Sequence, residues 1–296
     1  MTSRGRVAYP WRMVLYRVID GAGLIDPTMV VAFDGWVDAG SAATTATATL
    51  AADGEVVATF DADQLYDYRA RRPTLQIRDG RPAELSWPEL DLRRVHLADR
   101  DLLVLSGPEP DFRWHELAAA AVEIARQFGV REWLSLGAIP AAVPHTRPVP
   151  LLGTESRPGL LRGGVEPGPQ GVLQVPAAAV SMLDVAVAAA GVPAVGYFAQ
   201  IPHYVSGPYP QAALALLEAA GRHLGAELPS LGLAEEARQM RTRLDAAAST
   251  DETTRAYVER LEAMVDEARR PSGGDLIGEI ERFLRDQGSG RTDLPN

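Results

Sequence analysis

Three loops in this sequence carry side chains that could do acid–base chemistry, and each loop follows a short apolar run. In an α/β fold, such loops lie at the carboxyl edge of the sheet, where ligands bind. An aspartate beside a histidine at that edge could act as a general base. We therefore consider one candidate cleft, formed by Asp34, Trp36, Asp38, His145, Arg147 and His203.

The loop that contains Asp34 and Asp38 also has a structural interpretation. It leads into Ala42–Thr49, an alanine- and threonine-rich segment that forms a good helix only when it is buried against close neighbours. Asp38 or Ser41 would then cap this helix and Trp36 would pack, whereas in a functional interpretation the free helix N–H groups would bind an anion. Because the two aspartates would repel an anion, we favour the structural interpretation.

The two histidines of the candidate cleft each follow a proline. His145 lies in AIPAAVPHTRP and His203 lies in IPHYVSGPYP. In the structural interpretation the prolines fix the turns and the histidines form hydrogen bonds with the backbone. This interpretation is the commoner one for a histidine in a turn, and the catalytic one stays open beside it.

An arginine- and tyrosine-rich loop, DQLYDYRARRP, is a second candidate site. Its polar aromatic and basic residues are Tyr66, Tyr68, Arg69, Arg71 and Arg72. In an acidic protein this loop is the best candidate for binding an anion or a partner's carboxylates. The alternative is a solvated surface with Arg–Asp pairs, and both interpretations stay open.

The composition excludes several classes of function. The net charge is −10 without a basic block, so we expect neither nucleic-acid nor membrane binding. Cysteine is absent and all 29 basic residues are arginine, which excludes thiolate nucleophiles, Schiff bases and the phosphate-loop lysine. The histidines lack metal-ligand spacing and no dinucleotide fingerprint occurs, so we expect no metal and no cofactor. Without an apolar leader or a membrane-length run, the expected location is the cytoplasm.

Apolar runs of strand length alternate with helical patterns along the chain. In DFRWHELAAAAVEIARQFG, Asp111 is a candidate N-cap and Leu117, Ala121 and Ile124 form an apolar stripe. This alternation predicts an α/β fold with a doubly wound, mostly parallel sheet. The expected strands are Met13–Ile19, Met29–Phe33, Glu55–Phe60, Leu102–Leu105, Trp133–Leu136, Val172–Val175 and Val195–Ala199.

Changes in composition and hydrophobic pattern along the sequence divide the chain into three parts. Residues 1–229 form the expected α/β core, 230–287 a helical appendage, and 288–296 a flexible tail. The appendage has three amphipathic helical segments and is either a lid on the sheet or a partner-binding or oligomer surface. Within the core, Leu160–Gln170 is rich in Gly and Pro, and we expect it to be mobile.

Five ordered blocks closely resemble the bacterial, high-GC Gram-positive branch of the proteasome assembly chaperone 2 family. They are FDGWVDAGSAA, LYDYRARRP, SGPEPDFRW, IPAAVPHTRP and IPHYV…YPQAALALLEA. The resemblance implies a phosphorylase/hydrolase-like α/β core with helical additions and a tendency to self-associate. It also implies kinship with eukaryotic chaperones that pair proteasome α-subunits, and it transfers no catalytic residue. Two departures are the lack of a histidine after HTRP and an ending, RTDLPN, without the hydrophobic-Tyr tail of some archaeal relatives.

We therefore expect a non-enzymatic, oligomeric binding protein that acts as an assembly chaperone for the proteasome or another complex. A homo-oligomer is expected, with a trimer as one candidate state, and proteasome subunits are the expected partners. The alternative is a small-molecule hydrolase, transferase or ligand sensor that uses the candidate cleft. This alternative rests on analogy with the fold.

Overall fold

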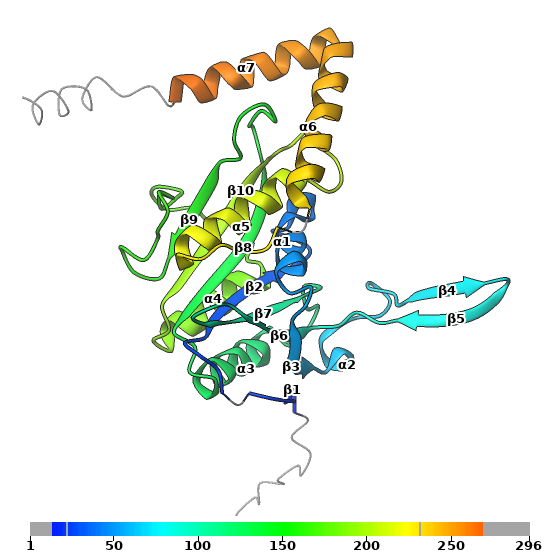
Figure 1. The fold of residues 1–296 in the computed structure, drawn as a ribbon, viewed down its shortest axis with the longest axis vertical. Helices are drawn as coiled ribbons and strands as arrows, with labels where there is room; N and C mark the ends of the chain where they lie inside the picture. The colour runs from blue at the N-terminus through cyan, green and yellow to red at the C-terminus, as the bar shows by residue number, and fades with distance from the viewer. Residues whose placement is uncertain (1–13, 22, 231, 269–296) are drawn as a thin grey trace, which may run out of the picture.

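The computed structural model describes residues 14–21, 23–230 and 232–268. These residues form an eight-stranded sheet with helices on both faces, a separate two-stranded hairpin and two C-terminal helices (Figure 1). The predicted α/β class is therefore confirmed. No helix in this part of the chain is long and apolar enough to cross a lipid bilayer.

The centre of the sheet is parallel and its flanks are antiparallel. The parallel strands are, in spatial order, β7 (Asp101–Gly107), β2 (Thr28–Phe33), β8 (Glu132–Ala141) and β10 (Ala194–Pro202). The antiparallel strands are β6 (Asp91–His96), β3 (Glu55–Phe60) and β1 (Tyr16–Val18) beyond β7, and β9 (Leu151–Glu155) beside β10. Every residue of β2 is buried, as a central parallel strand with both faces covered requires.

Helices cover the two faces of the sheet. One face of the sheet is covered by α1 (Ala42–Leu50) and α5 (Pro210–Leu224), which pack on Val30 and Ala32 of β2. The other face is covered by α3 (Trp114–Gln127) and α4 (Ala179–Ala189), which pack on Met29 and Val31 of β2. Three alanines of α1, Ala42, Ala43 and Ala46, are fully buried, and α1 packs on α5. The small side chains of α1 thus permit the close approach to α5, as its alanine- and threonine-rich sequence predicted. The short helices η1 (Ala39–Ser41) and α2 (Ala62–Leu65) follow β2 and β3.

Two local expectations are wrong. Asp111 does not cap α3, whose N-cap residue is Arg113; Asp111 instead accepts a hydrogen bond from the N–H of Asp67 at 2.8 Å. Val172–Val175 is not a strand. Its apolar side chains have no neighbouring strand and are largely exposed, so apolar character alone gave a misleading signal there.

A hairpin arm projects from the body of the protein (Figure 1). It consists of β4 (Thr74–Arg78) and β5 (Arg81–Ser86), paired only with each other, and all of its strand residues are exposed. The arm follows directly on the arginine- and tyrosine-rich loop. We call residues 74–86 the arm below.

Two helices lie in the region of the predicted appendage. α6 (Leu233–Thr250) packs on α5 through the buried side chains of Leu233 and Ala237, and α7 (Glu252–Ala268) follows after a sharp turn at Asp251 (Figure 1). The third predicted helix and the predicted tail, 288–296, lie outside the described residues. The division at residue 229 stays a prediction.

Leu160–Gln170 is attached to the sheet rather than free of contacts. The N–H groups of Leu160 and Leu161 donate to one carboxylate oxygen of Glu155 at 2.8 and 3.0 Å. Further along, the N–H of Gly168 donates to the carbonyl of Gly153 at 2.9 Å. The expectation of a mobile segment took its Gly and Pro content into account but not these backbone contacts with β9.

Candidate functional site

The structure joins Asp34 to the arginine- and tyrosine-rich loop. The Nη1 group of Arg71 donates to both carboxylate oxygens of Asp34, at 2.9 and 3.0 Å. The N–H of Glu109 donates to the same carboxylate at 2.8 Å, and Arg71 Nε lies 3.6 Å from the carboxylate of Asp111. Two sites that were separate in the sequence therefore form one charged cluster after β2 and β7.

The two tyrosines of the loop are structural. Tyr66 is buried and its hydroxyl donates to the carbonyl of Pro108 at 2.9 Å. Burial raises the pKa of Tyr66, so its phenol stays neutral. The hydroxyl of Tyr68 donates to Asp63 at 2.6 Å, and its ring meets that of Trp87 edge-on with 4.8 Å between centroids.

Three side chains of the candidate sites remain open to solvent. Trp36 is 62% exposed, and Arg69 and Arg72 are also exposed. Within the described chain, neither of these two guanidinium groups forms a hydrogen bond or an ion pair. These three residues are therefore available to a partner.

Asp38 caps the helix that follows it. It is 8% exposed, and its carboxylate accepts the N–H groups of Ala43 at 2.7 Å and Thr44 at 3.3 Å, together with the hydroxyl of Thr44. Ser41 forms no such bond through its side chain. Burial raises the pKa of Asp38, and these hydrogen bonds oppose the rise. The contacts match the structural interpretation of this residue.

His145 is buried where two loops meet α6. Its Nδ1 lies 2.7 Å from the hydroxyl of Tyr204, and its Nε2 lies 3.2 Å from the carboxylate of Asp245. Arg241 donates to the backbone carbonyl of His145 at 3.1 Å. Burial lowers the pKa of His145, and Asp245 opposes that change. The imidazole therefore joins the loop after β8 to the loop after β10 and to the appendage.

Arg147 and His203 make similar contacts with α7. Arg147 pairs with Asp266 at 2.7 Å and with Glu262 at 3.2 Å. The Nε2 of His203 lies 3.1 Å from the hydroxyl of Tyr257, and its Nδ1 lies 3.1 Å from the carbonyl of Ala141. Both residues thus contact the appendage, Arg147 while half-buried and His203 while exposed.

The six candidate cleft residues separate into groups by their contacts. Asp34 belongs to the charged cluster with Arg71, Asp38 caps α1, and His145, Arg147 and His203 contact α6 or α7. No hydrogen bond or ion pair within the described chain links an aspartate of the first loop to either histidine. An Asp–His general base is therefore not assembled from these residues.

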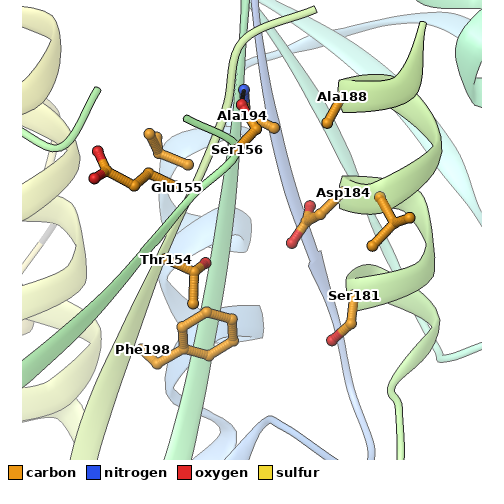
Figure 2. A pocket seen from close by; sticks show the side chains of 10 residues that line it. Thr154, Glu155, Ser156, Ser181, Asp184, Ala188, Ala194 and Phe198 are labelled. Atoms are coloured by element: carbon orange, nitrogen blue, oxygen red, sulfur yellow. Dashed lines mark hydrogen bonds between the residues drawn. The ribbon is translucent and has the colours of Figure 1, made fainter. Parts of the chain in front are cut away.

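A groove beside α4 was not predicted from the sequence. Its cavity volume is about 420 Å³, and it lies between α4 and the outer strands β9 and β10 (Figure 2). Asp184 and Phe198 line it. The only sequence signal was a single acidic residue within the apolar helix AAAVSMLDVAVAAAG, and its partners lie about 50 positions away on β8.

Among the described residues, no group of three or more histidine or acidic side chains is placed to hold a metal ion.

Comparison with known proteins identifies the family. The model of the PAC2 family matches residues 32–248, which is most of the chain and includes both candidate sites. The chain belongs to the PAC2 family. The match also extends into α6, so the family pattern includes the start of the appendage. No curated protein matches the chain.

Several solved PAC2-like structures share the fold. A PAC2 family protein from Streptomyces avermitilis is 38% identical, with 79% of this chain and 100% of that chain covered and a TM-score of 0.71. A Mycobacterium tuberculosis protein described as a proteasome-assembly chaperone homologue is 32% identical, covers 78% and 99%, and also has a TM-score of 0.71. A Corynebacterium glutamicum protein of unknown function is 31% identical, covers 87% and 99%, and has a TM-score of 0.80. These relatives confirm the resemblance to the branch found in high-GC Gram-positive bacteria.

Proposed function

We propose that this PAC2 protein is a non-enzymatic, oligomeric binding protein of the cytoplasm that assists assembly of the proteasome or of another multisubunit complex. The Mycobacterium tuberculosis relative, described as a proteasome-assembly chaperone homologue, supports the proposal. The structural observation that carries it is the arm. An exposed, unpartnered structure of this kind suits contact with another protein chain.

The arm has one apolar face. Leu75 pairs with Leu85 across the hairpin, Ile77 pairs with Pro82, and the three large side chains Leu75, Ile77 and Leu85 are 48, 61 and 46% exposed. An isolated two-stranded hairpin in water is marginally stable at best. No described residue outside the arm pairs with its strands, so its apolar face is open to a second molecule.

The proposed occupant of this apolar face is a second copy of the chain. Residues 69–86 contain five arginines and two acidic residues, whereas the whole chain has a net charge of −10. The arm itself is neutral, with two arginines and two acidic residues, so the positive charge of this segment comes from Arg69, Arg71 and Arg72 of the adjoining loop, and the remainder of the protein is acidic. Such complementarity favours association between copies and fixes their orientation. A homo-oligomer follows, with a trimer as one candidate state.

The exposed residues of the candidate sites are the proposed contacts with the client subunit. Arg69 and Arg72 have no intramolecular partner for their guanidinium groups in the described chain, and Trp36 lies exposed after β2. Arginine and tryptophan are favoured at the energetic centres of protein interfaces. Proteasome subunits are the clients that we propose first.

The alternative function, a hydrolase or transferase with an Asp–His pair, is less well supported. Asp38 is buried as a helix cap, and His145 is buried between Tyr204 and Asp245. A catalytic base must reach the proton that it removes from a substrate. Both side chains are occupied by contacts that hold the fold together.

An assembly assay tests the proposal. Proteasome α- and β-subunits from the same organism are mixed with and without the purified protein, and the rate of particle formation is followed by native gel electrophoresis. The proposal predicts faster assembly, with the protein absent from the final particle, and slower assembly with Arg69→Ala/Arg72→Ala. An unchanged rate together with no binding to any subunit contradicts it.

A further inference from the structure

The groove beside α4 has an aromatic floor. Phe198 is the cross-strand partner of Gly137 on β8, and Gly196 precedes it by two residues on β10. A Cβ atom on Gly137 would lie 2.5 Å from a Phe198 ring carbon, and one on Gly196 would lie 2.7 Å from another. The ring therefore occupies the space above both glycines, and it lines the groove (Figure 2).

The wall of the groove opposite β9 carries a carboxyl group. Figure 2 shows Asp184 projecting from α4 towards the strands. Its Oδ1 accepts the indole N–H of Trp133 at 2.9 Å and the hydroxyl of Ser135. Within the described chain, its Oδ2 has no hydrogen-bond partner and no basic side chain pairs with it.

The charge of Asp184 lacks compensation from within the described chain. Burial raises the pKa of Asp184 to about 7, although the bonds from Ser135 and Trp133 oppose that rise. Asp184 is half-buried in the groove, and a carboxylate that is partly removed from water without a counter-charge is energetically costly. A cation from outside the chain would supply the missing partner.

The remaining lining completes a site for a molecule with a charged end and an apolar body. Val185 and Ala188 provide apolar walls. The hydroxyls of Thr154 and Ser181 face the same space and form no hydrogen bond within the described chain (Figure 2). Glu155 also lines the groove and the N–H groups of Leu161 and Leu160 lower its pKa, but its carboxylate points away from Asp184 and Phe198 (Figure 2).

We propose that this groove binds an organic cation, an ammonium or guanidinium group on an alkyl chain, between the Asp184 carboxylate and the Phe198 ring. A carboxylate forms charge-assisted hydrogen bonds with such a group, and an aromatic face attracts it through the ring quadrupole. The alkyl carbons of the ligand pack on Val185 and Ala188, while its charged end stays at the polar side of the groove. The cavity volume of about 420 Å³ is that of a small-ligand site.

The cation has two possible sources: a free small molecule, or a lysine or arginine side chain of another protein. This chain contains no lysine, so a lysine in the groove would come from a different protein. The proposal does not rest on the assembly function, because it depends only on the side chains that line the groove.

Isothermal titration calorimetry of the full chain at pH 8 provides the test. The free-cation probes are putrescine and agmatine, and the side-chain probes are acetyl-Gly-Lys-Gly-amide and acetyl-Gly-Arg-Gly-amide. The peptide acetyl-Gly-norleucine-Gly-amide, in which an uncharged alkyl side chain replaces the lysine, is the neutral control. Binding of only the free amines identifies a small-molecule source, and binding of only the peptides identifies a protein source. If no cationic probe binds more tightly than the norleucine peptide, the proposal is overturned.

Matched variants assign any binding to the groove. Asp184→Asn keeps the size and an acceptor for Trp133 while it removes the charge, and it is expected to weaken cation binding about tenfold or more. Phe198→Leu is expected to weaken it roughly two- to fivefold. Asp53→Asn removes the same charge at an exposed position and should leave the affinity unchanged. Equal affinities of Asp184→Asn and the unaltered protein would place the cation elsewhere.

Measuring cation affinity at several pH values separates the contribution of the Asp184 charge from that of the side chain's shape. Asp184 and Glu155 are the titratable residues that line the groove in the described chain, and they come from α4 and β9. Because Asp184 titrates near neutrality, cation affinity is expected to rise between pH 6 and pH 8 in the unaltered protein. The rise should be absent in Asp184→Asn. A rise of equal size in both proteins contradicts the assignment.

Discussion

Arg71 donates hydrogen bonds from one nitrogen to both carboxylate oxygens of Asp34, at 2.9 and 3.0 Å. This contact fixes the end of the arginine- and tyrosine-rich loop, just before the arm, to the carboxyl edge of the sheet. It also brings two segments 37 residues apart in the sequence into one charged cluster. Arg71 is therefore a structural residue of the loop, whereas the guanidinium groups of Arg69 and Arg72 form no ion pair within the described chain.

The first prediction separates these roles. Arg71→Ala is expected to lower the free energy of unfolding by about 0.5–1 kcal/mol, because the ion pair that it removes is only partly buried. Arg72→Ala should leave stability unchanged and weaken partner binding. Urea unfolding and calorimetry with the client subunit measure the two effects. Equal midpoints for both variants would contradict the structural role of Arg71.

The second prediction concerns the cap of α1. Asp38→Ala should cost about 1–2 kcal/mol of unfolding free energy, because it leaves the N–H groups of Ala43 and Thr44 without an acceptor. Asp38→Asn keeps a side-chain oxygen and should cost less. Ser41→Ala is the control, since Ser41 forms no capping bond through its side chain. A larger loss for Ser41→Ala than for Asp38→Ala in urea unfolding would refute the assignment.

The third prediction concerns the attachment of the appendage. Burial lowers the pKa of His145 in the folded protein, so the unfolded chain binds a proton at higher pH than the folded chain does. The stability that neutral His145 contributes is therefore fully present above about pH 6.5, the value for an unperturbed histidine, and it is lost as pH falls through the folded pKa.

Comparison with a variant isolates this residue from other titrating groups. The stability difference between the unaltered protein and His145→Gln should shrink from pH 8 to pH 5, as measured by urea unfolding. Amide hydrogen exchange should speed up in α6 and α7 over the same range in the unaltered protein. His115→Gln, at an exposed position on α3, should show no such trend. A His145→Gln difference that is constant with pH would exclude the proposed titration.

The fold could be predicted from the sequence where burial leaves a periodic pattern. β2 and β3 match the predicted apolar runs almost residue for residue, because both are bounded by polar turns. Val172–Val175 has the same apolar character but no neighbouring strand, and strand formation depends on a partner. The arm was missed for the opposite reason, since none of its strand residues is buried within the chain.

The candidate sites were predicted less well, because their geometry depends on distant contacts. The sequence identified Asp38 correctly as one of two possible caps, but it could not choose between Asp38 and Ser41. It could not show that Arg71 would reach Asp34, or that Tyr257 of α7 would contact His203. Asp184 carried no local signal, since its hydrogen-bond partners lie on β8.

The apolar face of the arm gives a further prediction, which concerns association rather than folding. Leu75→Ser, Ile77→Ser and Leu85→Ser together should leave the thermal unfolding of the isolated chain nearly unchanged, because these side chains are exposed. The same triple variant should lose self-association. Gln76→Ser with Glu84→Ser changes the opposite face of the same hairpin and is the matched control. A loss of association in the control alone would contradict the assignment of the contact face.

Native mass spectrometry shows whether the protein self-associates through the arm and binds proteasome subunits. The unaltered protein, the triple arm variant and the control are each measured alone and mixed with proteasome α-subunits from the same organism. The account predicts a defined homo-oligomer and a hetero-complex for the unaltered protein and the control, and a monomer for the triple variant. A monomeric unaltered protein that ignores the subunits, or a triple variant that retains the full oligomer, would contradict it.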